Sequence, residues 1–113
     1  MQRLAIHLEE GLREVVDLDD VYYIEATEDD TLIRLASKRR RRDIRSMNTM
    51  VTKLRTAGFF RIHRTYLVNL NRIRLVRLRE SGRDWEVVMT SPVNKVLPVS
   101  RGLVEELLLA LEN

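Results

Sequence analysis

The sequence predicts a mostly β protein of antiparallel sheets, with a short helix in the middle of the chain and a short helix at its C-terminus. Three observations indicate this class. Several short segments alternate apolar and polar side chains, which is the two-residue period of a half-buried strand. Turn-forming residues separate these segments at short intervals. A helical period of apolar residues occurs around residue 50 and again at the end of the chain.

Four strands are expected in the first third of the chain. They cover residues 3–10, 13–18, 19–26 and 31–39. In the first of them Leu4, Ile6 and Leu8 share one side, so this side should face the core. Gly11 ends that strand. The polar run of residues 27–30 is a turn that lets the strands on either side of it pair as a hairpin.

The middle helix is expected to begin at Ser46, whose hydroxyl can accept a hydrogen bond from a backbone N–H of the first turn. Its apolar stripe consists of Met47, Met50, Val51 and Leu54. Gly58 should end the helix, because glycine readily adopts the left-handed conformation that follows a helix.

Three short strands and a second helix are expected in the last part of the chain. The strands cover residues 73–80, 84–90 and 95–100, and turns at Ser81-Gly82 and Ser91-Pro92 make them a meander. An amphipathic helix follows, with Ser100 as its expected N-cap. Leu109 lies off the apolar stripe of this helix, which indicates a second contact surface.

Length and composition bound the class of protein. The 113 residues suit one domain and are too few for two, so we expect a single domain with one core over residues 1–113 and no receiver domain. No apolar run approaches the roughly 18 to 20 residues of a membrane span, and the N-terminus lacks a secretion signal. The absence of Cys excludes disulfides and thiolate metal sites. These features predict a cytoplasmic protein without membrane contact.

The motifs of catalysis and metal binding are missing. His7 and His63 lie in unrelated contexts, whereas a zinc site needs ligands at fixed spacing. The sequence has no glycine-rich phosphate loop, no nucleophile elbow and no pair of carboxylates imposed by spacing. We therefore expect no enzyme activity, no metal and no cofactor.

Charge is distributed unevenly along the chain. Residues 1–33 hold two basic and ten acidic side chains, while residues 34–113 hold eighteen basic and seven acidic ones. This asymmetry indicates a surface that faces a polyanion, although the two regions could instead face each other or water. The densest basic run is Lys38 to Arg42.

Further Arg residues are spaced as rows along a strand. Arg72 and Arg74 should point the same way, as should Arg77 and Arg79, and such rows match the regular phosphates of a duplex. The chain has only one Trp, three Tyr and two Phe, so it offers few rings on which unpaired bases could stack. Double-stranded DNA is therefore favoured over single strands.

The segment FFRIHRTYLVNLNRI, residues 59–73, places His63, Arg64 and Thr65 in a row between two apolar runs. A buried strand would not carry these three polar side chains, so an exposed loop that contacts a polar partner is expected. Asn69 and Asn71, later in the segment, are expected to close turns with their side chains. Arg61 alternates with apolar neighbours, so it could either support the fold or contact a ligand.

Three motifs together resemble the LytTR-type DNA-binding domain of bacterial response regulators. The segment just quoted resembles one family signature, LPVSRGLVEEL at residues 97–107 resembles a second, and VYYIEA at residues 21–26 resembles a strand near the family's start. Their order and spacing are those of the family, so the resemblance covers roughly residues 4–111. It implies an elongated antiparallel β fold and a transcription regulator that binds direct repeats of double-stranded DNA, generally as two copies.

The resemblance also implies that loops, rather than a recognition helix, contact the bases in the major groove. The implied base contacts are His63, Arg64 and Arg101. Arg64 is the leading one, because Arg to the O6 and N7 of guanine is the commonest specific contact. Backbone phosphate contacts are expected from Thr65, Ser100, Lys38, Arg39, Arg40, Arg41, Arg42 and Arg61. Thr65 stands where the family usually has Ser, and it keeps the hydroxyl.

A third loop of the family corresponds to Glu28, Asp29, Asp30 and Thr31. This turn is acidic, so it departs from the family pattern and suits DNA only if a carboxylate accepts a hydrogen bond from a cytosine amine.

Partners and alternatives follow from the same features. The resemblance implies a second copy on DNA and a receiver or sensor domain, and the chain is either a stand-alone regulator or a separated domain. Two other functions stay open. One is an RNA-binding module that uses the same basic residues. The other is a protein-interaction domain that uses Leu109 and the acidic N-terminal third.

Overall fold

The computed structural model describes residues 2–37 and 39–112, which form an elongated body of 46 × 28 × 24 Å. In this part of the chain the strands are β1 (Arg3–His7), β2 (Arg13–Asp17), β3 (Val21–Ala26), β4 (Thr31–Leu35), β5 (Arg40–Asp43), β6 (Phe59–His63), β7 (Tyr66–Asn69), β8 (Ile73–Leu78), β9 (Trp85–Met89) and β10 (Val96–Val99). The helices are α1 (Met47–Leu54) and α2 (Val104–Leu111). The predicted class, mostly antiparallel β with a middle and a C-terminal helix, is confirmed.

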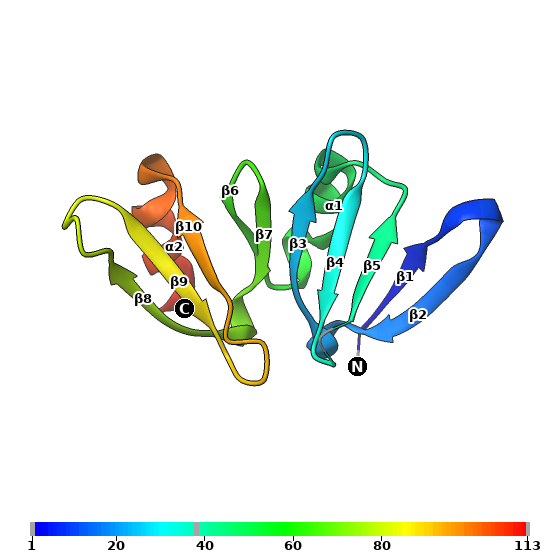
Figure 1. Ribbon diagram of the computed structural model, residues 1–113, viewed down its shortest axis with the longest axis horizontal. Helices are drawn as coiled ribbons and strands as arrows, with labels where there is room; N and C mark the ends of the chain where they lie inside the picture. Colours follow the sequence, from blue (N-terminus) through cyan, green and yellow to red (C-terminus); the bar gives the residue numbers. More distant parts are fainter. Residues whose placement is uncertain (1, 38, 113) are drawn as a thin grey trace.

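A five-stranded sheet with the order β5-β4-β3-β7-β6 occupies the middle of the molecule. The β1–β2 hairpin flanks it at one end of the long axis, and a three-stranded sheet of order β10-β9-β8 lies at the other end (Figure 1). Every strand pair is antiparallel. Because antiparallel neighbours reverse direction at each turn, many connections gather along two opposite edges of the molecule.

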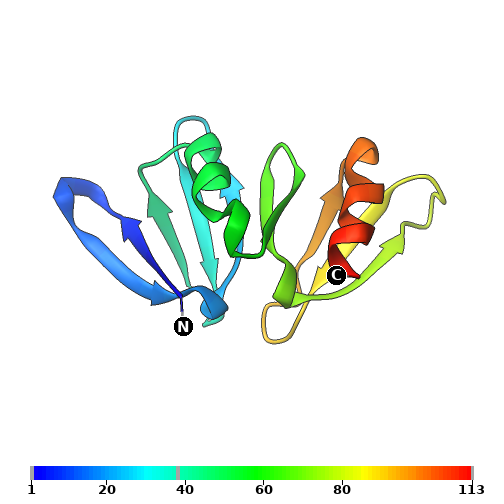
Figure 2. The same cartoon turned by 180° about the vertical axis from the view of Figure 1, so that it is seen from behind.

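The apolar interior forms two clusters, so the expectation of one core is wrong. Neighbouring residues of β3 and β7 point to opposite faces of the sheet, and both faces are buried. Ile24 joins the cluster that α1 covers, which includes Met50. Tyr23 and Val68 join the second cluster, which β9, β10 and α2 complete. Both helices lie on the same side of the molecule, in front of the strands in Figure 2.

Strand β5 was not predicted, because its sequence is dominated by Arg. β4 ends at Leu35, short of the predicted strand end, and the chain turns to pair β5 with β4. Asp43 anchors the new strand. Its fully buried carboxylate accepts hydrogen bonds from the backbone N–H groups of His7 and Arg45, each 2.9 Å long. The Arg45 guanidinium also donates to it, with Nη2 2.7 Å from Oδ2.

The predicted N-cap is confirmed for one helix and not for the other. Ser46 caps α1 as predicted, because its hydroxyl accepts from the backbone N–H of Thr49 at 3.3 Å. Ser100 makes no side-chain cap, and a 3-10 turn, Arg101–Leu103, precedes α2. The backbone N–H of Ser100 instead donates to the carbonyl of Ile62 at 2.8 Å, which fixes this residue to β6 in an extended conformation. The predicted capping role of Ser100 is therefore wrong.

Asn69 closes a turn as predicted, whereas Asn71 does not. The Asn69 amide is buried and donates to the carbonyls of Leu18 and Val21, while its oxygen accepts from the backbone N–H of Asn71. Asn71 is exposed, and within the described residues its side chain makes no hydrogen bond. One buried amide thus joins the end of β7 to the start of β3.

Among the described residues, no helix is long and apolar enough to cross a membrane.

Candidate nucleic-acid interface

Three turns lie beside one another along the upper edge of the molecule in Figure 1. They are the β3–β4 turn (residues 27–30), the β6–β7 turn (Arg64 and Thr65) and the turn after β10 (residues 100–103). The backbone N–H of Ala26 donates to the carbonyl of Thr65 at 2.8 Å, and Ser100 is joined to Ile62 as described above. The sheet therefore brings three motifs that are far apart in sequence to one edge, which we call the turn edge.

The β6–β7 turn is short and internally bonded. Its two residues, Arg64 and Thr65, connect the strands directly. The Nδ1 atom of His63 accepts a hydrogen bond from the backbone N–H of Thr65 at 3.1 Å. The His63 ring also lies 5.9 Å from the ring of Tyr66 between centroids. The half-buried His63 side chain and the backbone of Thr65 therefore hold the conformation of the turn at its base.

Arg61 binds the turn from beneath. Its Nη2 donates to the carbonyl of Arg64 at 2.7 Å and its Nε donates to the carbonyl of His63 at 3.4 Å. Its Nη1 donates to Oδ1 of Asn48, in the first turn of α1, at 3.3 Å. Of the two roles that the sequence left open for Arg61, the structure supports the structural one.

Arg64 itself is exposed at the tip of this turn. Among the ion pairs of residues 2–37 and 39–112, none includes Arg64. Its backbone carbonyl is fixed by Arg61, while its own guanidinium keeps its donors available. This combination suits a contact to a base or a phosphate, because guanidinium donors act in pairs on such acceptors.

Arg101 lies in the neighbouring turn and is 70% exposed. Its Nε is 3.0 Å from a carboxylate oxygen of Asp84, which is 44% exposed and belongs to the β8–β9 loop. An exposed pair of this kind is worth only about 0 to 1 kcal/mol. Asp84 can therefore orient Arg101 without preventing it from binding another anion.

The β3–β4 turn holds the acidic residues of the predicted third loop. Glu28 and Asp29 are exposed. Asp30 accepts a hydrogen bond from the Thr27 hydroxyl and pairs with Arg42 at 3.2 Å. These residues surround a small hollow of about 340 Å³. The pairing with Arg42 offsets one of the three negative charges at this part of the turn edge.

Thr31 was predicted as part of the site, and the structure contradicts this. It is fully buried in β4, and its hydroxyl donates to the carbonyl of Arg45 at 3.2 Å. A ligand at the surface cannot reach this hydroxyl, so the third loop is reduced to Glu28, Asp29 and Asp30.

The predicted basic run is divided by the alternation of β5. Arg39 and Arg41 both pair with Glu14 of β2, at 3.3 and 2.9 Å. Arg39 itself belongs to the β4–β5 connection. Lys38 lies outside the described residues. These contacts favour a structural role for Arg39 and Arg41 over the predicted phosphate contact.

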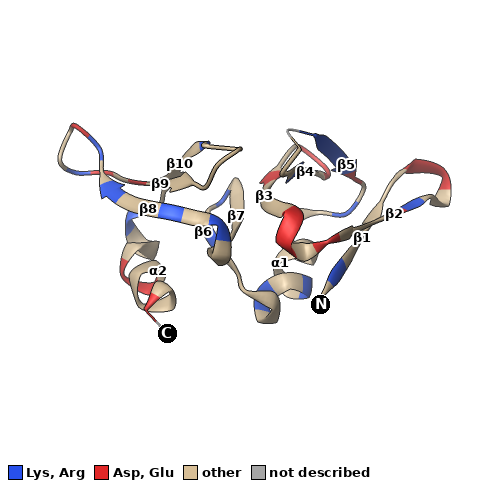
Figure 3. Ribbon diagram, turned by 90° about the horizontal axis from the view of Figure 1, so that it is seen from below, with Lys and Arg blue, Asp and Glu red and all other residues tan. Residues whose placement is uncertain are grey.

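Arg40 and Arg42 lie on the other face of the same strand. Arg42 pairs with Asp30, whereas Arg40 has no acidic partner in the part of the chain that the structure describes. Figure 3 shows basic residues along β5 and β8 and acidic residues at the β1–β2 tip. The charge asymmetry along the sequence is therefore also a separation of charges in the folded protein.

The predicted Arg rows near β8 are mostly engaged within the protein. Arg72 lies over the ring of Tyr22, at 5.3 Å, and donates to the carbonyl of Asp19. Arg77 and Arg79 both pair with Glu86, at 2.7 and 3.4 Å. Arg74 is exposed, but the row that it was expected to form with Arg72 is absent.

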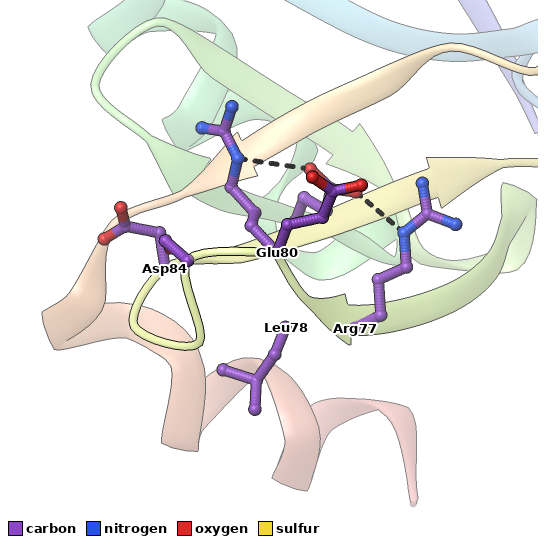
Figure 4. Close-up of a pocket in the computed structure, with 7 residues that line it drawn as sticks. Arg77, Leu78, Glu80 and Asp84 are labelled. Carbon is purple, nitrogen blue, oxygen red and sulfur yellow. Dashed lines mark hydrogen bonds and ion pairs between the residues drawn. The ribbon is translucent and has the colours of Figure 1, made fainter.

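A hollow of about 790 Å³ lies beside these residues in the β8–β9 region. Its lining includes the side chains of Arg77, Glu80 and Asp84 (Figure 4). Acidic and basic groups are mixed on its walls, and in the described residues no group of three His, Cys, Asp or Glu could hold a metal ion. Nothing in this hollow indicates a catalytic site.

Sequence reasoning missed Asn48 and Asp84, which contact the predicted site residues Arg61 and Arg101. Neither contact has a sequence signal, because each joins elements that only the tertiary fold brings together. It also missed Arg34, which alternation along β4 places on the face that Arg40 shares. No sequence signal marked this residue, because its cross-strand neighbour lies in β5, which was not predicted.

Comparisons with known proteins identify the class. The family model of the LytTr DNA-binding domain matches residues 13–112. A solved LytTr DNA-binding domain from Bacillus cereus has the same fold, with a TM-score of 0.77 at 19% identity, over 100% of this chain and 99% of that one. The chain therefore belongs to the LytTr DNA-binding domain family.

Particular relatives are regulatory proteins. The chain is 35% identical over 102 residues to the transcriptional regulatory protein YpdB of Escherichia coli K12, and it matches YpdB of Shigella flexneri equally well. The match covers 81% of this chain and only 36% of each relative. The chain thus corresponds to about a third of the length of these regulators.

Proposed function

We propose that this protein binds double-stranded DNA in a sequence-specific manner to regulate transcription, and that the β6–β7 turn enters the major groove. One observation carries the proposal. Arg64 stands exposed and without an ion pair among the described residues, on a turn whose backbone Arg61 and His63 hold in place. A base-contacting side chain on a fixed turn loses little conformational entropy on binding.

The two neighbouring motifs support the same arrangement. Arg101 contacts a second base or its phosphate, and the exposed donors of the 100–103 turn bind the backbone next to it. Thr65 and His63 position the turn, and through their remaining polar atoms they bind adjacent phosphates. In this arrangement the protein acts by binding alone, with no enzymatic step and no cofactor.

The acidic β3–β4 turn limits which DNA is accepted. Glu28 and Asp29 would repel a phosphate, so this part of the turn edge approaches the duplex only where a cytosine amine faces it. We propose that the turn discriminates against other bases there.

Two copies bind a direct repeat, and a receiver or sensor domain controls the assembly. The support for a larger regulator is the match to about a third of the length of transcriptional regulatory proteins. In bacteria such an assembly works in the cytoplasm, where the chromosome lies.

Selection of bound sequences from a random duplex library tests this function. We expect the purified protein to enrich a short motif that occurs twice in the same orientation, and a duplex RNA competitor to displace it poorly. Binding that depends on salt but enriches no sequence would reduce the role to a general polyanion surface. Equal competition by RNA would favour an RNA-binding module.

A further inference from the structure

We infer that Arg34 and Arg40 form a second phosphate-binding tract, on the face of the five-stranded sheet that lies away from α1. The inference rests on the proposed DNA binding and extends it. The loops of the turn edge contact bases, and this tract binds the backbone of the same duplex beside them. Arg34 belongs to no motif of the sequence and to none of the three turns.

Strand register places the two cations side by side. Arg34 of β4 is directly opposite Arg40 of β5. Their neighbours Ile33 and Leu35 are buried in the cluster that α1 covers, so alternation puts Arg34 on the opposite face. Tyr23 of β3 is the next residue in the same row, opposite Arg34. The row therefore runs from a buried tyrosine to an exposed arginine at the edge strand.

The pair is not neutralised within the described residues. Among residues 2–37 and 39–112, neither Arg34 nor Arg40 takes part in an ion pair. Like charges directly opposite one another on a sheet are destabilising. The neighbouring cations behave differently, because Arg41 and Arg42 each have a carboxylate partner. An anion bound between Arg34 and Arg40 would remove the repulsion.

A second observation concerns the Arg34 guanidinium. Its Nε is buried and has no hydrogen-bond partner in the described structure. Burial raises the pKa of the Tyr23 phenol, while the charges of Arg34 and Arg40 and a side-chain hydrogen bond with Arg34 act in the opposite direction. Because the Nε atom is buried, an anion at the surface binds the terminal nitrogens of the half-buried Arg34 side chain.

The tract lies behind the turn edge, towards the end of the sheet where β4 connects to β5. Thr31 is opposite Asp43 at the end of the strands nearest the turns, and the Arg34–Arg40 pair is three residues further along. At about 3.3 Å per strand residue the separation is roughly 10 Å. The major groove is about 8.5 Å deep. When a loop of the turn edge reaches the bases, the phosphates that flank the groove therefore lie a similar distance behind the turns, towards the tract.

The occupant is most consistent with a nucleic-acid backbone. A row of two unpaired guanidiniums binds phosphate oxygens with paired donors. Tyr66 and Tyr23, in edge-to-face contact at 6.0 Å, and then His63, connect the row to the β6–β7 turn. Packing contacts through the buried Tyr23, rather than an exposed surface, therefore link the row to the β6–β7 turn.

The experiment compares the salt dependence of operator binding for the wild type and for the Arg34→Gln, Arg40→Gln double variant. Lys53→Gln with Arg55→Gln is the control, because it removes the same charge from exposed residues of α1 and the 55–57 turn, away from the turn edge. Each lost phosphate contact lowers the slope of log K against log salt by roughly 0.9, so we expect a change of roughly 1.8 for the tract variant. The control slope should stay within error of the wild type.

Thermal melting without DNA provides a second measurement. Because the substitutions remove a like-charge contact, the melting temperature of the tract variant should stay the same or rise. A lower melting temperature would show that the two residues serve the fold, and an unchanged slope would show that no phosphate is bound there. Either outcome overturns the tract. If the wild type enriches an operator and these outcomes occur, the proposed function stands and the tract alone fails.

Discussion

At the scale of single residues, the main result is that Arg61 and Arg64, which lie close together in the sequence, have different roles. Arg64 is free to contact a ligand, whereas Arg61, three positions before it in β6, uses three donors inside the protein. The sequence shows both as arginines in an exposed motif. Only the hydrogen bonds distinguish the residue that binds from the residue that positions it.

Arg61→Gln should weaken DNA binding without changing its salt dependence. The substitution removes bonds to the carbonyls of His63 and Arg64, and charged hydrogen bonds are worth about 1.5 to 3 kcal/mol each before exposure reduces them. We expect the free energy of unfolding in urea to fall by about 1 to 2 kcal/mol. A phosphate contact would instead lower the salt slope by roughly one unit while leaving unfolding unchanged, and that result would restore the role predicted from sequence.

Sequence reasoning was most successful for residues with a local cause. Ser46 and Gly58 were predicted from the preferences of helix ends. Ser46 caps α1, and Gly58 adopts the left-handed conformation after the 3-10 turn Arg55–Ala57 that continues α1, which itself ends at Leu54. Thr31 was predicted as part of a DNA loop that the family resemblance implies, but its hydroxyl is buried against the Arg45 carbonyl. Whether a residue at a strand end faces water depends on its neighbours in space, which a single sequence does not reveal.

At the scale of elements, β5 shows how a charged segment becomes a strand. Its arginines point alternately to Glu14 on one side and to Asp30 on the other, and Asp43 fixes its end. Sequence patterning predicted β1 to β4 and β8 to β10 because their apolar residues alternate, but it did not assign β6 and β7, which flank the polar turn. It missed β5 because an edge strand held by ion pairs and one buried carboxylate has no apolar period.

Acid should destabilise the protein through Asp43. Burial alone would raise the pKa of this carboxyl, but the hydrogen bonds from the Arg45 side chain and from the backbone N–H groups of His7 and Arg45 hold it below its usual value. A carboxyl with a depressed folded pKa contributes stability above its unfolded pKa, near 4, and this contribution is lost as pH falls through the folded value.

Urea unfolding at pH 7 and at pH 3 measures this contribution. The wild type should lose more stability between the two conditions than Asp43→Asn, which carries no charge to protonate. An equal loss in both proteins would mean that other carboxyls cause the acid sensitivity.

Asn69 should be essential for the junction between β7 and β3. Asn69→Ala leaves the buried carbonyls of Leu18 and Val21 without partners, and each such group costs about 1 to 3 kcal/mol. We expect the free energy of unfolding to fall by about 2 to 4 kcal/mol. Asn71→Ala is the matched control, because that side chain is exposed and its removal should change stability by less than about 0.5 kcal/mol. Similar losses in the two variants would contradict this assignment.

At the scale of the whole molecule, the total charge is a poor guide to binding. The net charge is +3, yet four arginines of the predicted site, Arg39, Arg41, Arg42 and Arg101, form ion pairs within the protein. If Arg101, Arg34 and Arg40 bind phosphates while Arg64 contacts a base, the slope of log K against log salt should be roughly −3. Fluorescence anisotropy across a salt series measures it. A slope of about −5 would require that the three arginines paired with Glu14 and Asp30 also bind DNA.

The overall architecture was predictable from sequence because antiparallel neighbours in this fold are mostly consecutive in the chain. The adjacency of the three turns was implied only by the family resemblance, since it depends on β7 pairing with β3 and on Ser100 bonding to Ile62. Pairings between segments so distant in sequence leave no periodic trace. The ion pairs that decide which arginines are free have the same origin.

The central claim is that Arg64 contacts a guanine in the major groove, and a double-substitution cycle tests it most directly. The affinity of the wild type and of Arg64→Ala is measured on the selected operator and on the same operator with 7-deazaguanine at each guanine in turn, which removes only the N7 acceptor. We expect one guanine at which the base substitution weakens the wild type about tenfold, close to 1.4 kcal/mol, and leaves the variant unchanged. If every substitution weakens both proteins equally, Arg64 does not contact a base and the β6–β7 turn is not the element that determines specificity.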